Sequence, residues 1–292
     1  METGRTGRRI AIIAGSGRLP LFVTETLERQ GDRPFIIALE NEAAPALLQR
    51  EHEVLHPGRP GTLLRILRRV GPDAVVMIGG VRARPELRHL RPDWTTLKLG
   101  ARILQRLRSG DDALLRAVVT MVEDAGHTVV GVHELVPDLL ASPGFIAGTK
   151  MRTTDRESLE TALAGARVLG SLDAGQACVA IGRRVVALEG AEGTDAMLER
   201  VRELRASGRL SKAGGVLVKL AKPAQELRAD LPTIGPETVG RAAAAGLAGI
   251  GIHAGSALIV DYSATRDRAE EAGLFVIGID PDADQAGAGK DE

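Results

Sequence analysis

The chain has 292 residues, enough for two domains, and its 44% hydrophobic and 26% charged residues are typical of a soluble globular protein. The 38 basic and 38 acidic residues cancel, and aromatic residues make up only 2% of the chain, which argues against a general nucleic-acid-binding protein. The single cysteine, Cys178, excludes an internal disulfide and a cysteine-rich zinc site, and its apolar neighbours indicate a buried strand.

Short apolar runs alternate with amphipathic stretches in the first half of the chain. We predict strands over residues 10–14, 34–39, 74–80 and 128–134, and helices over residues 20–30, 63–71, 95–108 and 111–125. This alternation is typical of a parallel sheet with helices on both faces. We therefore expect a Rossmann-like α/β domain over residues 1–138.

The second half of the chain does not follow a simple alternation of strands and helices. Residues 137–148 hold two prolines and two glycines and are interpreted as a linker or crossover. Apolar runs around Gly182 predict a hairpin, followed by a helix that is capped by Thr194 and has one apolar face: Met197, Leu198, Val201 and Leu204. The remaining predicted elements are a strand in residues 215–223, a helix over 236–245, a second hairpin over 249–261, a helix over 263–272 and a strand over 274–280. We expect a mixed α/β catalytic domain over residues 139–292, with a loose polar tail after residue 280.

Two glycine-rich turns follow predicted strands. The turn GSGRLP (Gly15–Pro20) opens a helix, where free N–H groups attract anions, but Pro20 stands where a dinucleotide fingerprint has its third glycine. A plain turn explains this stretch equally well. Gly79 and Gly80 precede a basic cluster that suits a phosphate, an anionic membrane surface or a solvated loop: Arg82, Arg84, Arg88, His89 and Arg91.

Two acidic stretches precede predicted helices. Gly110, Asp111 and Asp112 have the composition of a helix N-cap, although adjacent aspartates also help to hold a divalent cation. The loop Glu189–Asp195 places three acids beside two glycines and a threonine. Mg²⁺ needs only one or two carboxylates beside a substrate phosphate, so this loop is either a magnesium site or a capped turn.

The stretch Val218–Gly235 brings together five charged or polar side chains that could act on a phosphate: Lys219, Lys222, Gln225, Arg228 and Asp230. Lysine and arginine neutralise phosphate charge, and an aspartate positions a metal or a water molecule. The six histidines show no metal-ligand spacing and are interpreted as structural or exposed: His52, His56, His89, His127, His133 and His253.

Taken in order, several stretches resemble the LpxI-type UDP-2,3-diacylglucosamine pyrophosphatases: IAGSGRLP, GDDALLRAV, LDAGQ, EGTDAM, KPAQELRADLPTIG, GLAGI and LFVIGID. The resemblance runs from about residue 10 to residue 280 and implies an N-terminal α/β domain, a C-terminal domain peculiar to the family and a substrate cleft between them. It also implies Mg²⁺-dependent cleavage of UDP-2,3-diacylglucosamine into UMP and 2,3-diacylglucosamine 1-phosphate (lipid X) for lipid A synthesis.

The resemblance also assigns residues. The family's essential aspartate matches Asp230, and we expect metal contacts from Asp230, Glu192 and Asp195. A departure occurs at Gly80, where family members often carry asparagine. The residues expected to contact the substrate are Gly15, Ser16, Gly17, Gly79, Gly80, Gly110, Asp111, Asp112, Gln176, Glu189, Gly193, Thr194, Asp195, Lys219, Lys222, Gln225, Arg228 and Thr233.

The expected partner is a lipid-linked nucleotide sugar. No apolar run reaches the ~18 residues of a membrane span, and the apolar run after the basic start is too short for a secretory signal. We expect a cytoplasmic protein that contacts the inner membrane transiently through residues 82–91, and an oligomer is compatible with the sequence. Two alternatives stay open: a nucleotide-sugar or NAD-dependent enzyme on a Rossmann-like domain, and a non-catalytic lipid- or nucleotide-binding module.

Overall fold

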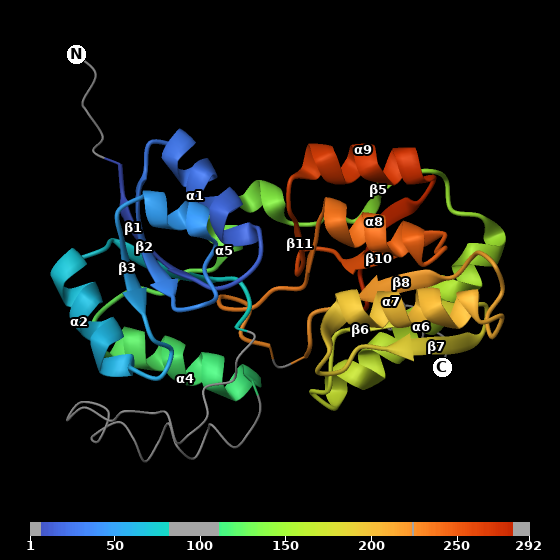
Figure 1. Ribbon diagram of the computed structural model, residues 1–292, viewed down its shortest axis with the longest axis horizontal. Coiled ribbons are helices and arrows are strands. Elements are labelled where there is room, and N and C mark those ends of the chain that lie inside the picture. The colour runs from blue at the N-terminus through green and yellow to red at the C-terminus, as the bar shows by residue number, and fades with distance from the viewer. Residues whose placement is uncertain (1–6, 82–110, 224, 283–292) are drawn as a thin grey trace, which may run out of the picture. The chain divides into compact units, whose positions relative to one another are not determined.

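The computed structural model describes residues 7–81, 111–223 and 225–282, and the chain divides into two compact units (Figure 1). The first unit comprises residues 1–138 and 226–230, and the second comprises residues 139–225 and 231–292. The five-residue segment Glu226–Asp230 therefore groups with the first unit, although the chain on either side of it belongs to the second. The basic cluster at 82–91, the predicted helix at 95–108, Gly110 and the tail after residue 282 lie outside the described residues.

The first unit is built on a parallel sheet in the order β3-β2-β1-β4. The strands are β1 (Arg9–Ala14), β2 (Arg33–Leu39), β3 (His52–Leu55) and β4 (Ala74–Ile78). The accompanying helices are α1 (Leu19–Arg29), η1 (Pro45–Gln49), α2 (Pro60–Val70), α4 (Asp111–Asp124) and α5 (Val132–Leu135), and η3 (Pro137–Leu139) spans the boundary with the second unit. The parallel α/β architecture predicted for this region is confirmed.

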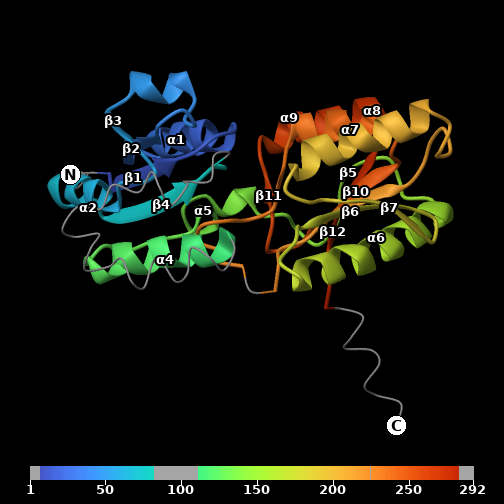
Figure 2. The same cartoon turned by 60° about the horizontal axis from the view of Figure 1, so that its bottom comes forward.

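Side chains of β1 alternate between the two faces of this sheet, as the period of a strand requires. Ala11 and Ile13 belong to one core together with Leu67 of α2 and Val122 of α4. Their neighbours on β1 point to the other face, which α1 covers; Figure 2 shows α1 and α4 on opposite sides of the sheet. Both faces of the sheet are thus buried, which explains why β4 is apolar along its whole length and β1 is apolar after Arg9.

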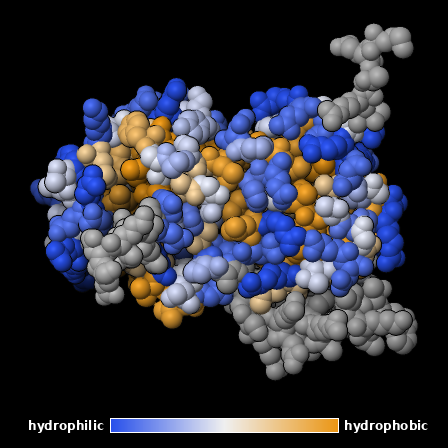
Figure 3. Space-filling view, turned by 180° about the vertical axis from the view of Figure 1, so that it is seen from behind, coloured by the Kyte–Doolittle hydropathy of each residue, from blue (hydrophilic) through white to orange (hydrophobic). Residues whose placement is uncertain are grey.

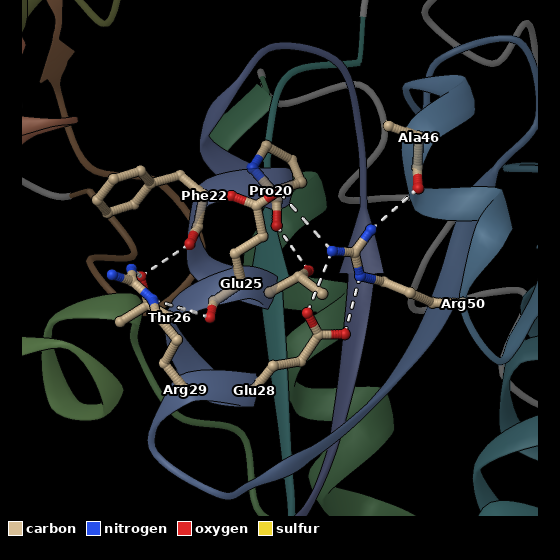
Figure 4. Close-up of polar contacts among 9 residues, drawn as sticks. Pro20, Phe22, Glu25, Thr26, Glu28, Arg29, Ala46 and Arg50 are labelled. Carbon is tan, nitrogen blue, oxygen red and sulfur yellow. Dashed lines mark hydrogen bonds and ion pairs between the residues drawn. The ribbon is translucent and has the colours of Figure 1, made fainter.

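Helix α1 takes part in two sets of polar contacts, one within the helix and one with the segment around η1 (Figure 4). The Thr24 hydroxyl donates to the Pro20 carbonyl at 2.7 Å, which satisfies a polar group inside the helix. Arg50, just after η1, donates through Nε and Nη2 to both carboxylate oxygens of Glu28, at 2.8 and 3.1 Å, and through Nη1 to the Ala46 carbonyl at 3.1 Å. A two-pronged arginine–carboxylate pair has a defined geometry. It therefore holds η1 against α1.

The strand predicted over residues 128–134 is wrong. Only Val129 pairs with the sheet, through a single parallel bridge to Val75. The Glu134 carboxylate then accepts the Gly131 N–H at 2.7 Å, which is the geometry of a helix start. The chain consequently turns into α5 instead of extending the sheet.

The second unit contains a mixed six-stranded sheet in the order β5-β12-β10-β8-β6-β7. Strands β8, β10 and β12 are parallel, whereas β5, β6 and β7 each run antiparallel to a neighbour. The strands are β5 (Gly144–Gly148), β6 (Ala177–Ile181), β7 (Arg184–Leu188), β8 (Val216–Lys219), β10 (Gly249–His253) and β12 (Phe275–Ile279). The mixed sheet expected for this region and the hairpin around Gly182 are confirmed.

Helices cover both faces of the mixed sheet (Figures 1 and 2). They are α6 (Thr153–Ser171), α7 (Gly193–Ala206), α8 (Pro236–Ala244) and α9 (Tyr262–Ala272). Leu159 and Ala162 of α6 pack with Cys178 and Val218 in one core. The other three helices contribute to a second core, which includes Met197, Leu198, Val201, Val239, Ala242 and Ala269.

Two further expectations for this region are corrected. Residues 249–261 do not form a hairpin, because β10 lies in the large sheet and β11 (Leu258–Ile259) pairs in parallel with β9 (Thr233–Ile234). The Ala257 carbonyl accepts from Ala141, which draws the chain away from β10. Residues 137–148 are more than a linker, since they include η3 and the edge strand β5.

The surface is a mixture of polar and apolar residues. Figure 3 shows hydrophobic residues interspersed with hydrophilic ones on one face, and exposed apolar side chains include Phe145, Val168 and Leu172. In the described part of the chain, no helix combines the length and apolarity needed to span a bilayer.

Candidate active site

The two glycine turns of the first unit meet each other. Ser16 and Gly80 exchange backbone hydrogen bonds at 2.7 and 3.1 Å, and the Ser16 hydroxyl also donates to the Gly80 carbonyl at 2.9 Å. A Cβ on Gly79 would lie 2.6 Å from the Ser16 carbonyl oxygen, and one on Gly15 would lie 2.4 Å from the Gly80 carbonyl oxygen. Such contacts are too short for any side chain. These glycines therefore allow two backbones to touch beside the start of α1.

The second unit gathers other predicted residues where β8 ends. Lys219, the last residue of β8, is paired with Ala177 of β6, and the Leu220 N–H donates to the Gln176 carbonyl at 2.9 Å. The Glu189 N–H donates to the Ala177 carbonyl at 2.9 Å, which places Glu189 at the same end of the sheet. Loops at the carboxyl ends of parallel strands are the usual ligand-binding places in α/β proteins.

Glu189 organises the start of α7. Its side chain is buried, with the residue 7% exposed, and its two oxygens accept from the Thr194 hydroxyl at 2.7 Å and from the Gln176 N–H at 3.2 Å. The prediction that Thr194 caps α7 is therefore wrong. The N-cap residue is Glu192, which makes no side-chain capping hydrogen bond. The threonine hydroxyl is instead used by a buried acid. The Gln176 side-chain oxygen is buried without a hydrogen-bond partner among the described residues.

The two other acids of this loop are paired with arginines. Glu192 lies 3.1 Å from Arg200, and Asp195 lies 3.3 Å from Arg241. Among the residues that the structure describes, no three histidine, cysteine or carboxylate side chains come together as a metal-binding group. The loop is consequently ordered by charge pairs within the second unit.

Lys219 is a buried cation. The residue is only 9% exposed, and its Nζ donates to the Thr233 carbonyl at 3.2 Å. Thr233 in turn donates its hydroxyl to the Leu231 carbonyl at 2.9 Å. A lysine ammonium has three donors, and burying it is costly unless it is compensated. A carbonyl is a neutral partner, so this position is well suited to an anionic ligand.

Lys222 begins the loop that leads to Asp230. Its Nζ lies 2.5 Å from Asp173, which follows α6, and its N–H donates to the Gln225 side-chain oxygen at 2.8 Å. Gln225 therefore braces the loop. Asp173 was not identified from the sequence, because the two residues are 49 positions apart.

Arg228 is held by two carboxylates within the first unit. Its Nε and Nη2 donate to both oxygens of Glu226, at 2.9 and 3.1 Å, and its Nη1 donates to Glu123 of α4 at 2.6 Å. These partners raise the pKa of the Arg228 guanidinium, and Arg228 chiefly lowers the pKa of Glu226. Ala229 packs against the core of this unit. Arg228 thus braces the turn that presents Asp230.

Asp230 is half-buried, and its N–H donates to the Glu226 carbonyl at 3.0 Å. It is the last residue of the segment that groups with the first unit. The first unit also contains Gly15, Ser16, Gly17, Gly79, Gly80, Arg228 and, at the start of α4, Asp111 and Asp112. The second unit contains Gln176, Glu189, Glu192, Gly193, Thr194, Asp195, Lys219, Lys222, Gln225 and Thr233.

The fold and these loops define an α/β protein of two units with buried cationic and acidic groups where strands end. The family model of the LpxI N-terminal domain matches residues 9–139, and the family model of the LpxI C-terminal domain matches residues 142–277. The chain belongs to the LpxI family, which confirms the resemblance found in the sequence.

One curated relative matches nearly the whole chain. UDP-2,3-diacylglucosamine pyrophosphatase LpxI of Caulobacter vibrioides is 39% identical over 276 residues, covering 94% of this chain and 98% of that protein. Similar solved structures include Bordetella bronchiseptica WbmG in complex with NAD, with 18% identity, a TM-score of 0.29, and coverage of 44% of this chain and 37% of that one. CobK precorrin-6A reductase is 12% identical with a TM-score of 0.30, over 94% of this chain and 88% of that one. Structural similarities this weak carry no argument about function.

Proposed function

We propose that the protein hydrolyses the pyrophosphate of UDP-2,3-diacylglucosamine, giving UMP and 2,3-diacylglucosamine 1-phosphate for lipid A synthesis. The observation that carries this proposal is the 39% identity to the Caulobacter vibrioides pyrophosphatase over 94% of this chain. The similarity includes both domains of the family, so it is not limited to a shared nucleotide-binding fold.

The chemistry requires positive charge near the diphosphate. Water must approach a phosphorus surrounded by anionic oxygens, a P–O bond of the anhydride breaks, and the departing phosphate carries away negative charge. Buried Lys219 is suited to bind this charge because its described partner is a neutral carbonyl. Lys222 would exchange its contact with Asp173 for phosphate oxygens. Asp230 would orient the attacking water or receive its proton.

We also propose that Mg²⁺ takes part. Mg²⁺ is commonly held by one or two carboxylates together with water and substrate phosphates, and when bound it offsets the negative charge of the phosphates. Asp230 fits this donor type because it is a half-buried carboxylate on a braced turn. Glu192 and Asp195 are the further candidate ligands, and each would have to release an arginine.

The acyl chains of such a substrate favour contact with a lipid surface, because each exposed CH₂ costs about 0.8 kcal/mol in water. We therefore propose a cytoplasmic protein that binds the inner membrane reversibly. Binding of the protein to vesicles that contain anionic lipid, before and after neutralising the arginines of residues 82–91, tests this proposal. Equal vesicle binding by the wild type and the neutralised variant would show that the basic cluster does not mediate membrane binding.

The activity is tested by measuring UMP release from UDP-2,3-diacylglucosamine with Mg²⁺ and with EDTA. Asp230→Asn should lose nearly all turnover, whereas Asp124→Asn, an exposed acid on α4, should match the wild type. Wild-type turnover in Asp230→Asn would end the assignment of this residue. A non-catalytic binding module would release no UMP, and an NAD-dependent enzyme would show a thermal shift with NAD.

A further inference from the structure

His253 lies on β10, between β8 and β12 of the mixed sheet, at the end of the sheet that carries the candidate site. It is the last residue of β10 and is in register with Ile279 of β12, while the residue before it, Ile252, is in register with Lys219 of β8. The backbone is fixed here because the Ala254 N–H donates to the Ile279 carbonyl at 2.9 Å. The half-buried imidazole therefore starts from a rigid position.

The imidazole reaches the loop that follows β8. The Ala221 N–H donates to His253 Nδ1 at 3.3 Å. An N–H group donates only to an unprotonated ring nitrogen, so a neutral His253 carries its proton on Nε2. Burial lowers the pKa of His253, although the charges of Asp282 and Asp280 oppose this effect. The neutral form that accepts from Ala221 is therefore favoured.

Three successive N–H groups of this loop are each satisfied by a different group. Leu220 donates to the Gln176 carbonyl at 2.9 Å, Ala221 to His253 at 3.3 Å, and Lys222 to the Gln225 side chain at 2.8 Å. The first bond continues the sheet and the third lies within the loop. The bond to His253 is thus a side-chain tether from another strand. It fixes the direction in which the chain leaves β8 towards Lys222.

We propose that His253 is a positioning residue, which holds Ala221 so that Lys222 and the loop to Asp230 present their side chains to the substrate. This inference rests on the proposed function, because it assigns the loop to substrate binding. His253 itself acts through the loop backbone and exchanges no proton with the substrate. Because Lys222 binds the diphosphate in the ground state as well, loss of the tether should raise KM more than it lowers kcat.

The test compares two substitutions. His253→Asn keeps an acceptor oxygen close to the position of Nδ1, whereas His253→Leu keeps the volume and removes the acceptor. We expect His253→Leu to lower kcat/KM about tenfold, in line with the loss of one ordering hydrogen bond, and His253→Asn to stay within about threefold of the wild type. His52→Leu, at an exposed histidine of β3, is the matched control. Equal kcat/KM for the asparagine and leucine variants would overturn the proposal.

A second readout does not depend on activity. Hydrogen exchange of the Ala221 amide should become about tenfold faster in His253→Leu and remain slow in His253→Asn. Unchanged protection in His253→Leu would show that the tether is not needed. If the wild-type protein releases no UMP, the proposed function fails, while the exchange experiment still decides whether His253 orders the loop.

Discussion

Arg228 and Glu123 form a 2.6 Å ion pair across 105 positions of the chain, and this pair ties the turn before Asp230 to helix α4. The turn is further held by the two bonds between Arg228 and Glu226. The catalytic aspartate that we propose is therefore presented by a braced segment, although the segment has no regular secondary structure of its own.

Glu123→Gln should affect turnover more than folding. The pair is partly exposed, so its loss should cost less than about 1 kcal/mol of unfolding free energy. The freedom gained by the turn should nevertheless lower kcat for UMP release about two- to fivefold, because reacting groups must be held closely. Urea unfolding and steady-state kinetics measure the two effects, with Asp124→Asn as the neighbouring control. A purely thermodynamic effect, with unchanged kcat, would contradict the bracing role.

Lys219→Met should separate stability from activity. Removing the ammonium relieves a buried charge but leaves the Thr233 carbonyl without its donor, so the melting temperature should change little. If Lys219 binds phosphate, kcat/KM should fall about ten- to a hundredfold. The measurement is UMP release combined with thermal unfolding. A variant that loses stability and keeps kcat/KM would assign Lys219 to the fold alone.

Two glycines of α6 should respond oppositely to alanine. A Cβ on Gly165 would lie 2.6 Å from the sulfur of Cys178, whereas one on Gly170 would meet its nearest atom, on Pro223, at 3.5 Å. Gly165→Ala should therefore cost about 1–3 kcal/mol by overpacking. Gly170→Ala should be neutral or stabilise by up to about 1 kcal/mol, as expected within a helix. Urea unfolding compares the two, and equal effects would contradict the packing around Cys178.

Cys178 should be unreactive in the folded protein. Burial raises the pKa of its thiol to about 12, so the thiolate is scarce at pH 8. Iodoacetamide should leave the native protein unmodified and alkylate it in urea, as mass spectrometry would show. Rapid modification without denaturant would place this thiol outside the core.

Asp32 should contribute to stability in a pH-dependent way. Arg8 donates three bonds to its carboxylate, at 3.0, 3.2 and 2.6 Å, and these lower the pKa of Asp32. A lowered folded-state pKa means that the stabilisation is complete above the unfolded value of about 4 and is lost as the pH falls through the folded value. Urea unfolding across this acidic range should show a smaller pH dependence in Asp32→Asn. If the stability of the wild type and of Asp32→Asn depended on pH in the same way, the Arg8–Asp32 pair would not be a source of the pH dependence.

Local sequence patterns were sufficient for the elements whose neighbours in the chain are also their neighbours in space. The hairpin around Gly182 and the amphipathic helix α7 belong to this group. The second predicted hairpin failed because residues 249–253 and 258–259 have apolar runs around a glycine, yet each run pairs with a strand that is remote in sequence. Strand β3 was missed because it is short and carries polar residues, with Val54 53% exposed.

The candidate site shows the same division. Lys219, Lys222 and Asp230 became candidates because charged residues gather in one stretch, and Asp230 also because of the family resemblance. No role was predicted for Asp173, although it lies in the quoted stretch LDAGQ, or for Glu123, because their partners lie 49 and 105 positions away. His253 was interpreted as structural or exposed, since its spacing fits no metal motif, and its contact with Ala221 depends on two strands being adjacent. Long-range pairing decides such contacts, and no local pattern encodes it.

The segment Glu226–Asp230 also decides how the protein can be taken apart. Because this segment groups with the first unit and its flanks with the second, the polypeptide passes between the units at three points. A fragment that ends at Asp138 would lack the part that places Ala229 against its core. The remaining fragment, residues 139–292, would contain Glu226–Asp230 without the unit with which this segment groups. Neither half is a self-sufficient module, so duplication, fusion or exchange of one half by recombination would separate Asp230 from the helix that braces it.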